Sequence, residues 1–404
     1  MYKYIIMTEK YNIFFKVKLP EEPLRMKRFS AANTQNISYI PPQYFSGTQL
    51  LNLYNVPTVT PATPSTKQTK IAIVIAFTYP GLLADLNTYW KSDINFGAGS
   101  TPPKVKVYTM PGATKNTGWA QEECLDVQMA CSINPNANIS VVEAKSDSPT
   151  DLMVAIDYAV NKLKVDVVSM SWGDRENSIY SSYNNRFTNT SVSFCAASGD
   201  DNVVSWPSTL SNCISVGGTT LLWTPYGEQI RKEYAWNKAG CGYSSMVSQP
   251  GYQKNISGIT HTHRAIPDIS LIANQQTCVY TVYAGQWYGV GGTSVATPIF
   301  AAMISLANQM RFNENKGALT SVYTAANSIT PLTNNIQHYL YTVLYPNKTE
   351  YQNAFYDVIL GTNRGSLAGT TRGLTTYSSN TGYDLTTGLG SPKCTNLCTS
   401  LSKI

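Results

Sequence analysis

A serine lies in a glycine-rich segment with the features of a nucleophile at the start of a helix. The segment GVGGTSVATP at residues 289–298 precedes a continuous apolar run. The glycines let the backbone bring Ser294 to the N-terminus of a predicted helix over 294–309, where free amides and the helix dipole favour developing negative charge. Pro298 fits the first turn of this helix, where its missing N–H costs little. Taken alone, the pattern also fits an ordinary glycine-rich helix N-cap.

A hydroxyl nucleophile needs a general base, and the histidines do not supply one. The chain has only His261, His263 and His338, none of them in an H-G-T-H type context. His261 and His263 lie in a polar loop, which is typical of surface residues. No aspartate ends the first predicted strand, where residues 75–79 read IAFTY. The sequence therefore disfavours a Ser-His-Asp arrangement.

Two carboxyl groups are placed to act instead of histidine. The segment QEECLDVQ at 121–128 puts Glu122 and Asp126 four residues apart, on one face of a predicted helix over 117–130. Two carboxyls at this spacing repel each other when both are ionised, so one tends to keep a proton. A solvated acidic face is the alternative, although apolar neighbours such as Trp119 and Leu125 favour burial.

A third segment presents another carboxyl group. The run SFCAASGDD at 193–201 reads as a strand that ends in Ser-Gly-Asp, with Asp200 at the carboxyl edge of a sheet. Ligand sites of open α/β sheets lie at that edge. An aspartate in an ordinary loop turn is the alternative.

The elements that would position these residues alternate between strand and helix. Apolar runs predict strands at 70–77, 105–110, 137–144, 165–172 and 192–198, and the region 280–290 reads as a strand or hairpin. Helical spacing covers 117–130, 149–162 and 294–309, whereas the last fifty residues read as an ordered loop region. This order predicts an α/β fold with a mostly parallel central sheet and helices on both faces.

Composition excludes several classes of protein. Charged residues make up 13% of the 404 residues, the net charge is +6, and no run of like charges occurs. We therefore expect no nucleic-acid partner and no membrane-surface site. No apolar stretch reaches 18 residues, which predicts no membrane span. Residues 1–20 lack the apolar core and cleavage site of a signal peptide, and the compartment stays open.

Eight cysteines occur without a C-x-x-C pair, so a zinc ribbon or a redox motif is not expected. Their pairing stays open, and buried free thiols are the expectation for several of them. The spacings of Cys124 to Cys131 and of Cys394 to Cys398 fit helical positions.

The segments that carry Glu122 and Asp126, Asp200, and Ser294 occur in this order along the chain. Together they resemble the sedolisins, the serine-carboxyl peptidases with a subtilisin-like three-layer fold. Further segments are similar to that family: YIPPQYF at 39–45, LYNVP at 53–57, VSMSWG at 168–173, WPS at 206–208, ISVGGT at 214–219 and IPDIS at 266–270. The resemblance covers residues 39–404 as one peptidase domain with a C-terminal calcium loop. Residues 1–38 would be a leader or the remnant of a prodomain.

The resemblance implies a role for each candidate catalytic residue. Ser294 would be the nucleophile, Glu122 the general base, Asp126 its carboxyl partner, and Asp200 the oxyanion-hole donor. Glu122 is chosen over Glu123 because the family pattern is E-x-x-L-D.

The resemblance also implies one structural Ca²⁺ ion in the C-terminal region. The segments FYDVILGTN at 355–363 and NTGYDLTTGLGS at 380–391 are similar to the family's calcium loop. Side-chain and carbonyl oxygens are the ligands that calcium takes. The expected ligands are Asp357, Val358, Asn380, Gly382 and Asp384. Residues 364–379 between the two halves are longer than is typical.

The implied activity is that of an acid-acting serine-carboxyl endopeptidase. Its expected substrate is a polypeptide, and the expected active unit is a monomer. One carboxyl must be ionised while others stay protonated, which predicts an acidic optimum. The segment WNKAGCGYSS at 236–245 replaces a more glycine-rich family stretch, so cleavage preference is expected to differ. The short N-terminal region leaves one alternative of another class: a catalytically silent structural or binding protein on a peptidase fold.

Overall fold

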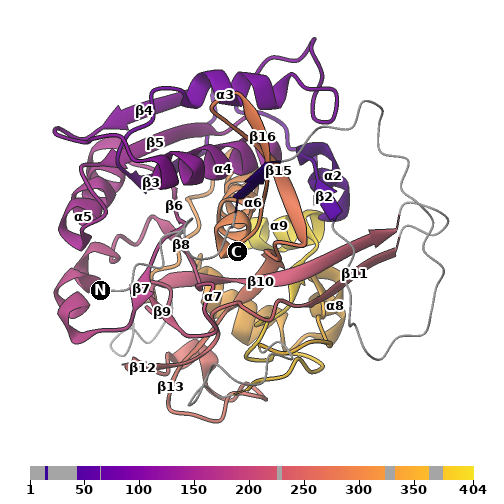
Figure 1. The fold of residues 1–404 in the computed structure, drawn as a ribbon. Coiled ribbons are helices and arrows are strands. Elements are labelled where there is room, and N and C mark those ends of the chain that lie inside the picture. The colour runs from indigo at the N-terminus through magenta and orange to yellow at the C-terminus, as the bar shows by residue number, and fades with distance from the viewer. Residues whose placement is uncertain (1–13, 17–42, 64, 225–229, 324–332, 364–375) are drawn as a thin grey trace.

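A computed structural model describes residues 14–16, 43–63, 65–224, 230–323, 333–363 and 376–404 (Figure 1). Most of the predicted leader, and most of the loop at 364–379, lie outside the described residues. One short piece of the leader, β1 (Phe14–Lys16), pairs antiparallel with β16 (Gln286–Val290) of the main body. The domain boundary after residue 38 stays a prediction.

The described residues form a central sheet of eight strands, seven of them parallel. The parallel strands, in their order across the sheet, are β4 (Val105–Thr109), β5 (Asn138–Ala144), β3 (Lys70–Ala76), β6 (Val167–Met170), β8 (Ser193–Ala197), β10 (Cys213–Thr224) and β14 (Ile269–Ile272). The antiparallel strand β11 (Ile230–Ala235) also pairs with β10. Nearly every residue of β3, β6 and β8 is buried, as expected for strands covered on both faces. The predicted mostly parallel sheet is confirmed.

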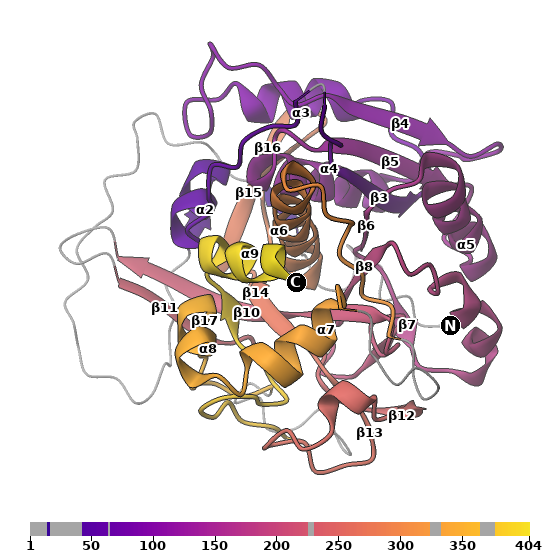
Figure 2. The same ribbon diagram turned by 180° about the vertical axis from the view of Figure 1, so that it is seen from behind.

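Helices cover both faces of this sheet. The long helices α4 (Thr117–Ile133) and α6 (Thr293–Asn313) pack against each other on one face, and α5 (Pro149–Asp157) lies on the opposite face (Figures 1 and 2). The other helical segments are α2 (Gly47–Leu53), α3 (Leu82–Trp90), η1 (Tyr158–Leu163), η2 (Ser178–Arg186), η3 (Gly251–Gln253), α7 (Ile336–Tyr339), η4 (Leu340–Leu344), α8 (Lys348–Ala354) and α9 (Cys394–Lys403). None of the helices within these ranges has the length and apolarity needed to cross a membrane.

Smaller sheets surround the main one. The strand β15 (Thr277–Tyr283) forms the predicted hairpin with β16, and β2 (Gln43–Phe45) pairs with β15. The two-stranded pairs are β7 (Asp174–Arg175) with β9 (Ser205–Trp206), β12 (Gly242–Ser248) with β13 (His263–Ile266), and β17 (Phe355–Tyr356) with β18 (Ser391–Pro392). The hairpin delivers the chain directly to the start of α6, so it sets the approach to Ser294.

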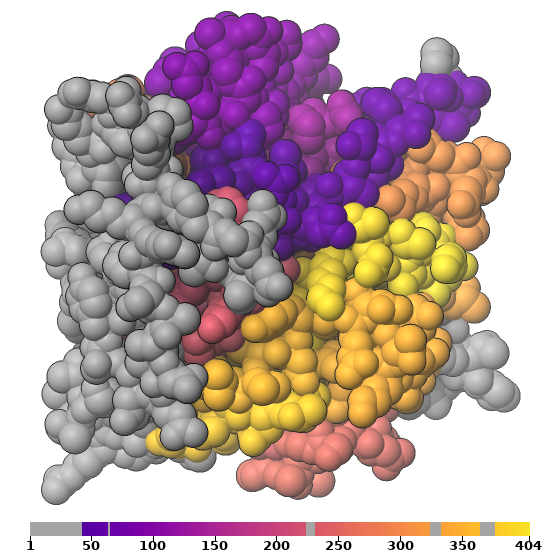
Figure 3. All heavy atoms as spheres, turned by 90° about the vertical axis from the view of Figure 1, so that its right-hand side faces the viewer, coloured from indigo at the N-terminus to yellow at the C-terminus, as the bar shows by residue number. Residues whose placement is uncertain are grey.

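The C-terminal end corrects one sequence-based expectation. Residues 394–403 form α9, although the last fifty residues were expected to be a loop. Seven of these ten residues are Cys, Thr, Asn or Ser, which are weak helix formers. Burial of Leu397, Cys398 and Leu401 stabilises the helix instead. The N–H of Cys394 donates to the carbonyl of Tyr54 at 2.8 Å, and Figure 3 shows this yellow segment against the indigo one.

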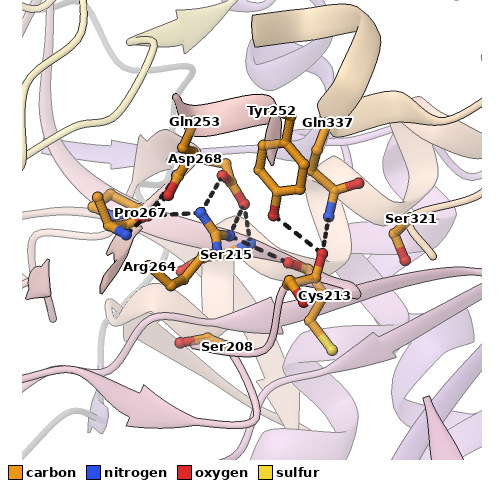
Figure 4. Close-up of polar contacts among 12 residues, drawn as sticks. Ser208, Cys213, Ser215, Tyr252, Gln253, Arg264, Pro267, Asp268, Ser321 and Gln337 are labelled. Atoms are coloured by element: carbon orange, nitrogen blue, oxygen red, sulfur yellow. Dashed lines mark hydrogen bonds and ion pairs between the residues drawn. The ribbon is translucent and has the colours of Figure 1, made fainter. Parts of the chain in front are cut away.

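A buried ion pair joins β13, the central sheet and the C-terminal segment (Figure 4). Arg264 and Asp268 are both fully buried, and Arg264 Nη2 lies 2.5 Å from Asp268 Oδ2. The Tyr341 hydroxyl and the Ser215 N–H each donate to the Asp268 carboxylate at 2.8 Å. The Asp268 carbonyl accepts from the N–H of Leu389 at 2.8 Å. Removing one partner of such a pair typically costs about 3–5 kcal/mol, so this network fixes the C-terminal segment on the sheet.

Candidate active site

The helix α4 places Glu122 and Asp126 on one buried face. Asn116 begins the helix, and its side chain accepts a hydrogen bond from the N–H of Trp119. Both carboxyl groups are fully buried, because α4 packs against α6 along this face. The alternative of a solvated acidic face is therefore wrong.

The start of α6 presents Ser294 to these carboxyls. Gly292 precedes the helix with φ of +131°, a conformation that residues with a side chain rarely adopt. Thr293 is the first helical residue, so Ser294 lies in the first turn, where backbone N–H groups have no partner within the helix. Ser294 is 6% exposed, so it is buried but not completely closed off from solvent.

The Ser294 hydroxyl interacts with the Glu122 carboxyl. Both oxygens of Glu122 are buried and have no donor within hydrogen-bond distance in the described chain. The Ser294 hydroxyl is nevertheless near enough to favour the ionised form of this carboxyl. Burial raises the pKa of Glu122 well above its usual range, the Asp126 charge raises it further, and the Ser294 hydroxyl lowers it. A carboxyl next to a serine hydroxyl in a water-poor site has the position of a general base.

Ser171 connects Asp126 to the helix that carries Ser294. Its hydroxyl donates to Asp126 Oδ1 at 2.8 Å and lies 3.4 Å from the Ser294 carbonyl oxygen. That carbonyl has no helical donor, because residue 298 is a proline without an N–H. Pro298 thus lies inside α6 rather than in its first turn, which corrects the sequence-based expectation. Burial raises the pKa of Asp126 well above its usual range, and the Ser171 bond lowers it.

Asp200 approaches the start of α6 from the end of β8. Its Oδ1 accepts from the N–H and the hydroxyl of Thr293, each at 2.8 Å. A Cβ built on Gly292 would lie 2.8 Å from Asp200 Oδ2, so any larger residue at position 292 would displace that oxygen. Burial raises the pKa of Asp200, while the two Thr293 bonds lower it. The second carboxyl oxygen therefore lies beside the first turn of α6, where an oxyanion would form.

The three histidines lie elsewhere. His261 is exposed and stacks on Tyr243 at a ring distance of 4.2 Å, His263 begins β13, and His338 contacts Thr342 in the α7 region. None of the three makes a hydrogen bond to Ser294 or to the carboxyls around it. The predicted absence of a Ser-His-Asp arrangement agrees with these positions.

The five expected calcium ligands gather in one part of the C-terminal segment. The N–H of Gly382 donates to Asp357 Oδ2 at 2.9 Å, and the N–H of Asn380 donates to Asp384 Oδ2 at 3.0 Å. Asp384 Oδ1 is occupied by bonds from Thr386 and Thr387.

These residues fit a calcium ion by the chemistry of their donors. Burial raises the pKa of both Asp357 and Asp384, and no salt bridge of the described chain reaches either carboxyl. The carboxylates of the buried Asp384 and the half-buried Asp357, without a basic partner, favour a cation. No cluster of three or more Asp, Glu, His or Cys side chains gathers in the described ranges, so backbone carbonyls would have to complete the ligand set.

Sequence reasoning missed two parts of the site. Ser171 lies in the VSMSWG segment, which was recognised as family-like, yet nothing in the sequence indicated its contact with Asp126. Glu123 was set aside in favour of Glu122, but it is 1% exposed and its carboxyl is a hydrogen-bond partner of the Glu143 carboxyl. Glu143 is 20 positions away on another element, so no local pattern predicts this pair.

The sequence profile described as "Subtilase family" matches residues 112–350, which is more than half of the chain. The chain belongs to the subtilase family. Among curated proteins, this subtilase is 30% identical over 237 residues to sedolisin of Pseudomonas sp. (strain 101), covering 56% of the chain and 38% of that protein. It is 27% identical over 333 residues to kumamolisin of Bacillus sp. (strain MN-32), covering 73% of the chain and 54% of that protein.

Two further comparisons agree with these. The subtilase is 26% identical over 328 residues to tripeptidyl-peptidase 1 of Dictyostelium discoideum, covering 73% of the chain and 49% of that protein. The solved structure of Pseudomonas sedolisin, a serine-carboxyl proteinase complexed with two molecules of pseudo-iodotyrostatin, superposes with a TM-score of 0.71. At 24% identity it covers 90% of this chain and 99% of that one, which confirms the subtilisin-like fold.

The subtilase is thus similar to sedolisin, kumamolisin and a tripeptidyl-peptidase, which are the kinds of protein that the resemblance implied. The chain spans about half, or less, of the length of the curated relatives it matches.

Proposed function

We propose that the chain hydrolyses peptide bonds as an acid-acting serine-carboxyl endopeptidase. Ser294 is the nucleophile, Glu122 the general base, Asp126 its carboxyl partner and Asp200 the oxyanion donor. The observation that carries the proposal is the placement of the Ser294 hydroxyl, at the start of α6, beside the fully buried Glu122 carboxyl.

The proposed acylation step moves one proton and forms one bond. Ionised Glu122 takes the hydroxyl proton as Ser294 Oγ attacks the peptide carbonyl carbon. Protonated Asp200 and the first-turn N–H groups of α6 stabilise the oxyanion. Glu122 then gives its proton to the leaving amine as the C–N bond breaks. A water molecule, deprotonated by Glu122, releases the acyl group in the second half of the reaction.

The roles of the carboxyls define a pH range. Glu122 must be ionised, whereas Asp200 must carry a proton to donate a hydrogen bond. Aspartate and glutamate titrate at about 3.9 and 4.3 in water, and burial raises these values here. The set titrates as a coupled group, so the proposal predicts an activity maximum on the acid side of neutrality.

A single calcium ion would stabilise the C-terminal segment. Asp357 and Asp384 would bind it with carboxylate oxygens, and Val358, Asn380 and Gly382 with backbone carbonyls. The ion would supply charge that neutralises the buried Asp384 and the half-buried Asp357, and it would take no part in the chemical steps. The proposed substrate is a polypeptide chain, and the proposed active unit is a monomer.

Cleavage of an unfolded protein substrate between about pH 3 and about pH 8 tests the proposal, with Ser294→Ala as the matched control. We expect activity that peaks below about pH 6 and is abolished in the variant. A peak at alkaline pH, or equal cleavage by Ser294→Ala, contradicts the mechanism. Absence of cleavage by the folded, calcium-supplemented protein favours the catalytically silent alternative.

A further inference from the structure

A second pair of carboxyl groups includes Glu123, the residue next to Glu122 on α4. Glu123 on α4 and Glu143 on β5 are each 1% exposed, and their side chains are hydrogen-bond partners. Two ionised carboxylates in contact in a buried site repel strongly, so such a pair holds one proton between them. Neither residue has a part in the proposed chemistry.

The donors around the pair show which carboxyl keeps the proton. Glu143 Oε1 accepts from the N–H of Tyr79 at 2.9 Å, and its Oε2 accepts from the hydroxyl of Thr109. Glu123 Oε1 has no hydrogen-bond partner within the described chain. Both oxygens of Glu143 thus act as acceptors, so the O–H that joins the two carboxyls is assigned to Glu123.

The charged and titratable groups around Glu123 reinforce this distribution. Glu143 faces it from β5, and Asp126 acts on it from the next turn of α4. Cys124 is its neighbour on the helix, and Asp85 of α3 lies against that thiol at 3.8 Å. No basic group is among those that act on Glu123, and burial together with the Glu143 charge raises its pKa well above the usual range.

The position of Glu123 on α4 couples the pair to the active site. Successive residues of an α-helix are rotated by about 100°, so a bond from Glu123 to β5 sets the direction in which Glu122 points. We propose that Glu123 is a positioning residue, whose carboxylic O–H donates to the Glu143 carboxylate and thereby holds α4 in the rotation that presents Glu122 to Ser294. When Glu123 loses its proton, the bond becomes a repulsion between two carboxylates. The positioning role of Glu123 rests on the proposed function, whereas the existence of the protonated Glu123–Glu143 pair does not depend on it.

Stability as a function of pH tests the protonated pair without any use of activity. In a Ser294→Ala background, the unfolding equilibrium constant is measured by urea denaturation at constant calcium, between about pH 5 and about pH 7. Glu123 keeps its proton in the folded chain and loses it in the unfolded chain over this range. It therefore contributes about a tenfold rise in the unfolding constant per pH unit.

We expect Glu123→Gln to remove that contribution, so that the slope of the logarithm of the unfolding constant against pH falls by about one proton. Glu350→Gln, on the exposed side of α8, is the matched control and should leave the slope unchanged. Glu123→Leu provides a second variant, because it also removes the titrating carboxyl and should lower the slope by the same amount. An unchanged slope in folded Glu123→Gln or Glu123→Leu overturns the proposal.

Kinetics tests the positioning role. Glutamine can still donate to Glu143 but cannot ionise, so Glu123→Gln should keep kcat within about twofold at the acid optimum and extend activity to higher pH. Glu123→Leu lacks the donor and should lower kcat about tenfold with KM nearly unchanged. Full kcat in Glu123→Leu overturns the positioning role. A wild type without any peptidase activity contradicts the proposed function instead, and the stability measurement still decides the state of the pair.

Discussion

The hydroxyl of Ser171 donates to Asp126 Oδ1 at 2.8 Å and so connects the strand end after β6 with the buried face of α4. The same hydroxyl lies 3.4 Å from the Ser294 carbonyl, which Pro298 leaves without a helical donor. One side chain thus contacts both helices that carry the proposed catalytic residues. This relationship makes Ser171 part of the proposed site, although it does not face the substrate carbonyl.

Replacing Ser171 by alanine should lower kcat about tenfold, because Asp126 loses its donor and the pKa of that carboxyl rises further. Ser169→Ala is a matched control: this serine lies two residues earlier on β6, is equally buried, and its hydroxyl has no hydrogen-bond partner in the described chain. Steady-state kinetics and thermal unfolding of both variants check the prediction. Equal loss of kcat in the two variants would argue against a specific role for Ser171.

Gly292→Ala should abolish most activity while the chain still folds. The substitution places a Cβ 2.8 Å from Asp200 Oδ2 at a φ of +131°, so it displaces the proposed oxyanion donor. Loss of one such donor typically costs about 100- to 1,000-fold in kcat. Gly285→Ala is the control, since Gly285 also has positive φ but nothing within 4 Å of its would-be Cβ. Near-normal kcat in Gly292→Ala would contradict the placement of Asp200.

The chain should be more stable in acid than at neutral pH. Glu122, Glu123, Asp126 and Asp200 all have a pKa that burial raises in the folded state. The folded chain therefore holds protons that the unfolded chain releases above about pH 4, and stability falls as pH rises from there. Each such proton lowers the free energy of unfolding by about 1.4 kcal/mol for each unit by which the pH rises.

Urea unfolding of Ser294→Ala at about pH 4 and about pH 7, with calcium held constant, measures this effect. Asp126→Asn should reduce the dependence on pH. Stability that increases between the two pH values would contradict the protonated state of these carboxyls.

Calcium should stabilise the wild type through Asp357 and Asp384. With free calcium about 100-fold above its Kd, the expected gain is about 2.7 kcal/mol. Asp357→Asn should lose most of this gain, and the variant is preferable to one at residue 384, whose carboxyl also holds its own turn. Asp93→Asn, at an exposed position, is the control. Thermal unfolding with and without a chelator measures the gain in stability. An equal gain from calcium in the wild type, Asp357→Asn and Asp93→Asn would exclude this site.

The fold could be predicted from sequence where elements are apolar and regular. The buried strands β3, β5 and β8 and the helix α4 were predicted within a few residues, because continuous apolar runs and helical spacing report burial directly. The helix α9 was missed because its stability comes from packing rather than from helix propensity. The position of Pro298 in α6 was misjudged because the sequence does not fix the first helical residue.

The candidate site was predicted as residue types rather than as a geometry. Spacing alone brought together Glu122 and Asp126, which share a helix. The meeting of these carboxyls with Ser294 and Asp200 depends on the packing of α4, β8 and α6, and only the family resemblance anticipated it. The Glu123–Glu143 pair and the Ser171 bond join distant elements, so they became visible only in the structure.

The measurement that tests the central claim most directly is the rate at which a fluorophosphonate labels the chain, with the modified residue identified by mass spectrometry. The account predicts labelling at Ser294 and none in Ser294→Ala. It further predicts that Glu122→Gln labels about 100-fold more slowly than the wild type, because the base is lost. Labelling that is unaffected by Glu122→Gln, or that rises through about pH 6.5 as a histidine base would require, would contradict the serine-carboxyl mechanism.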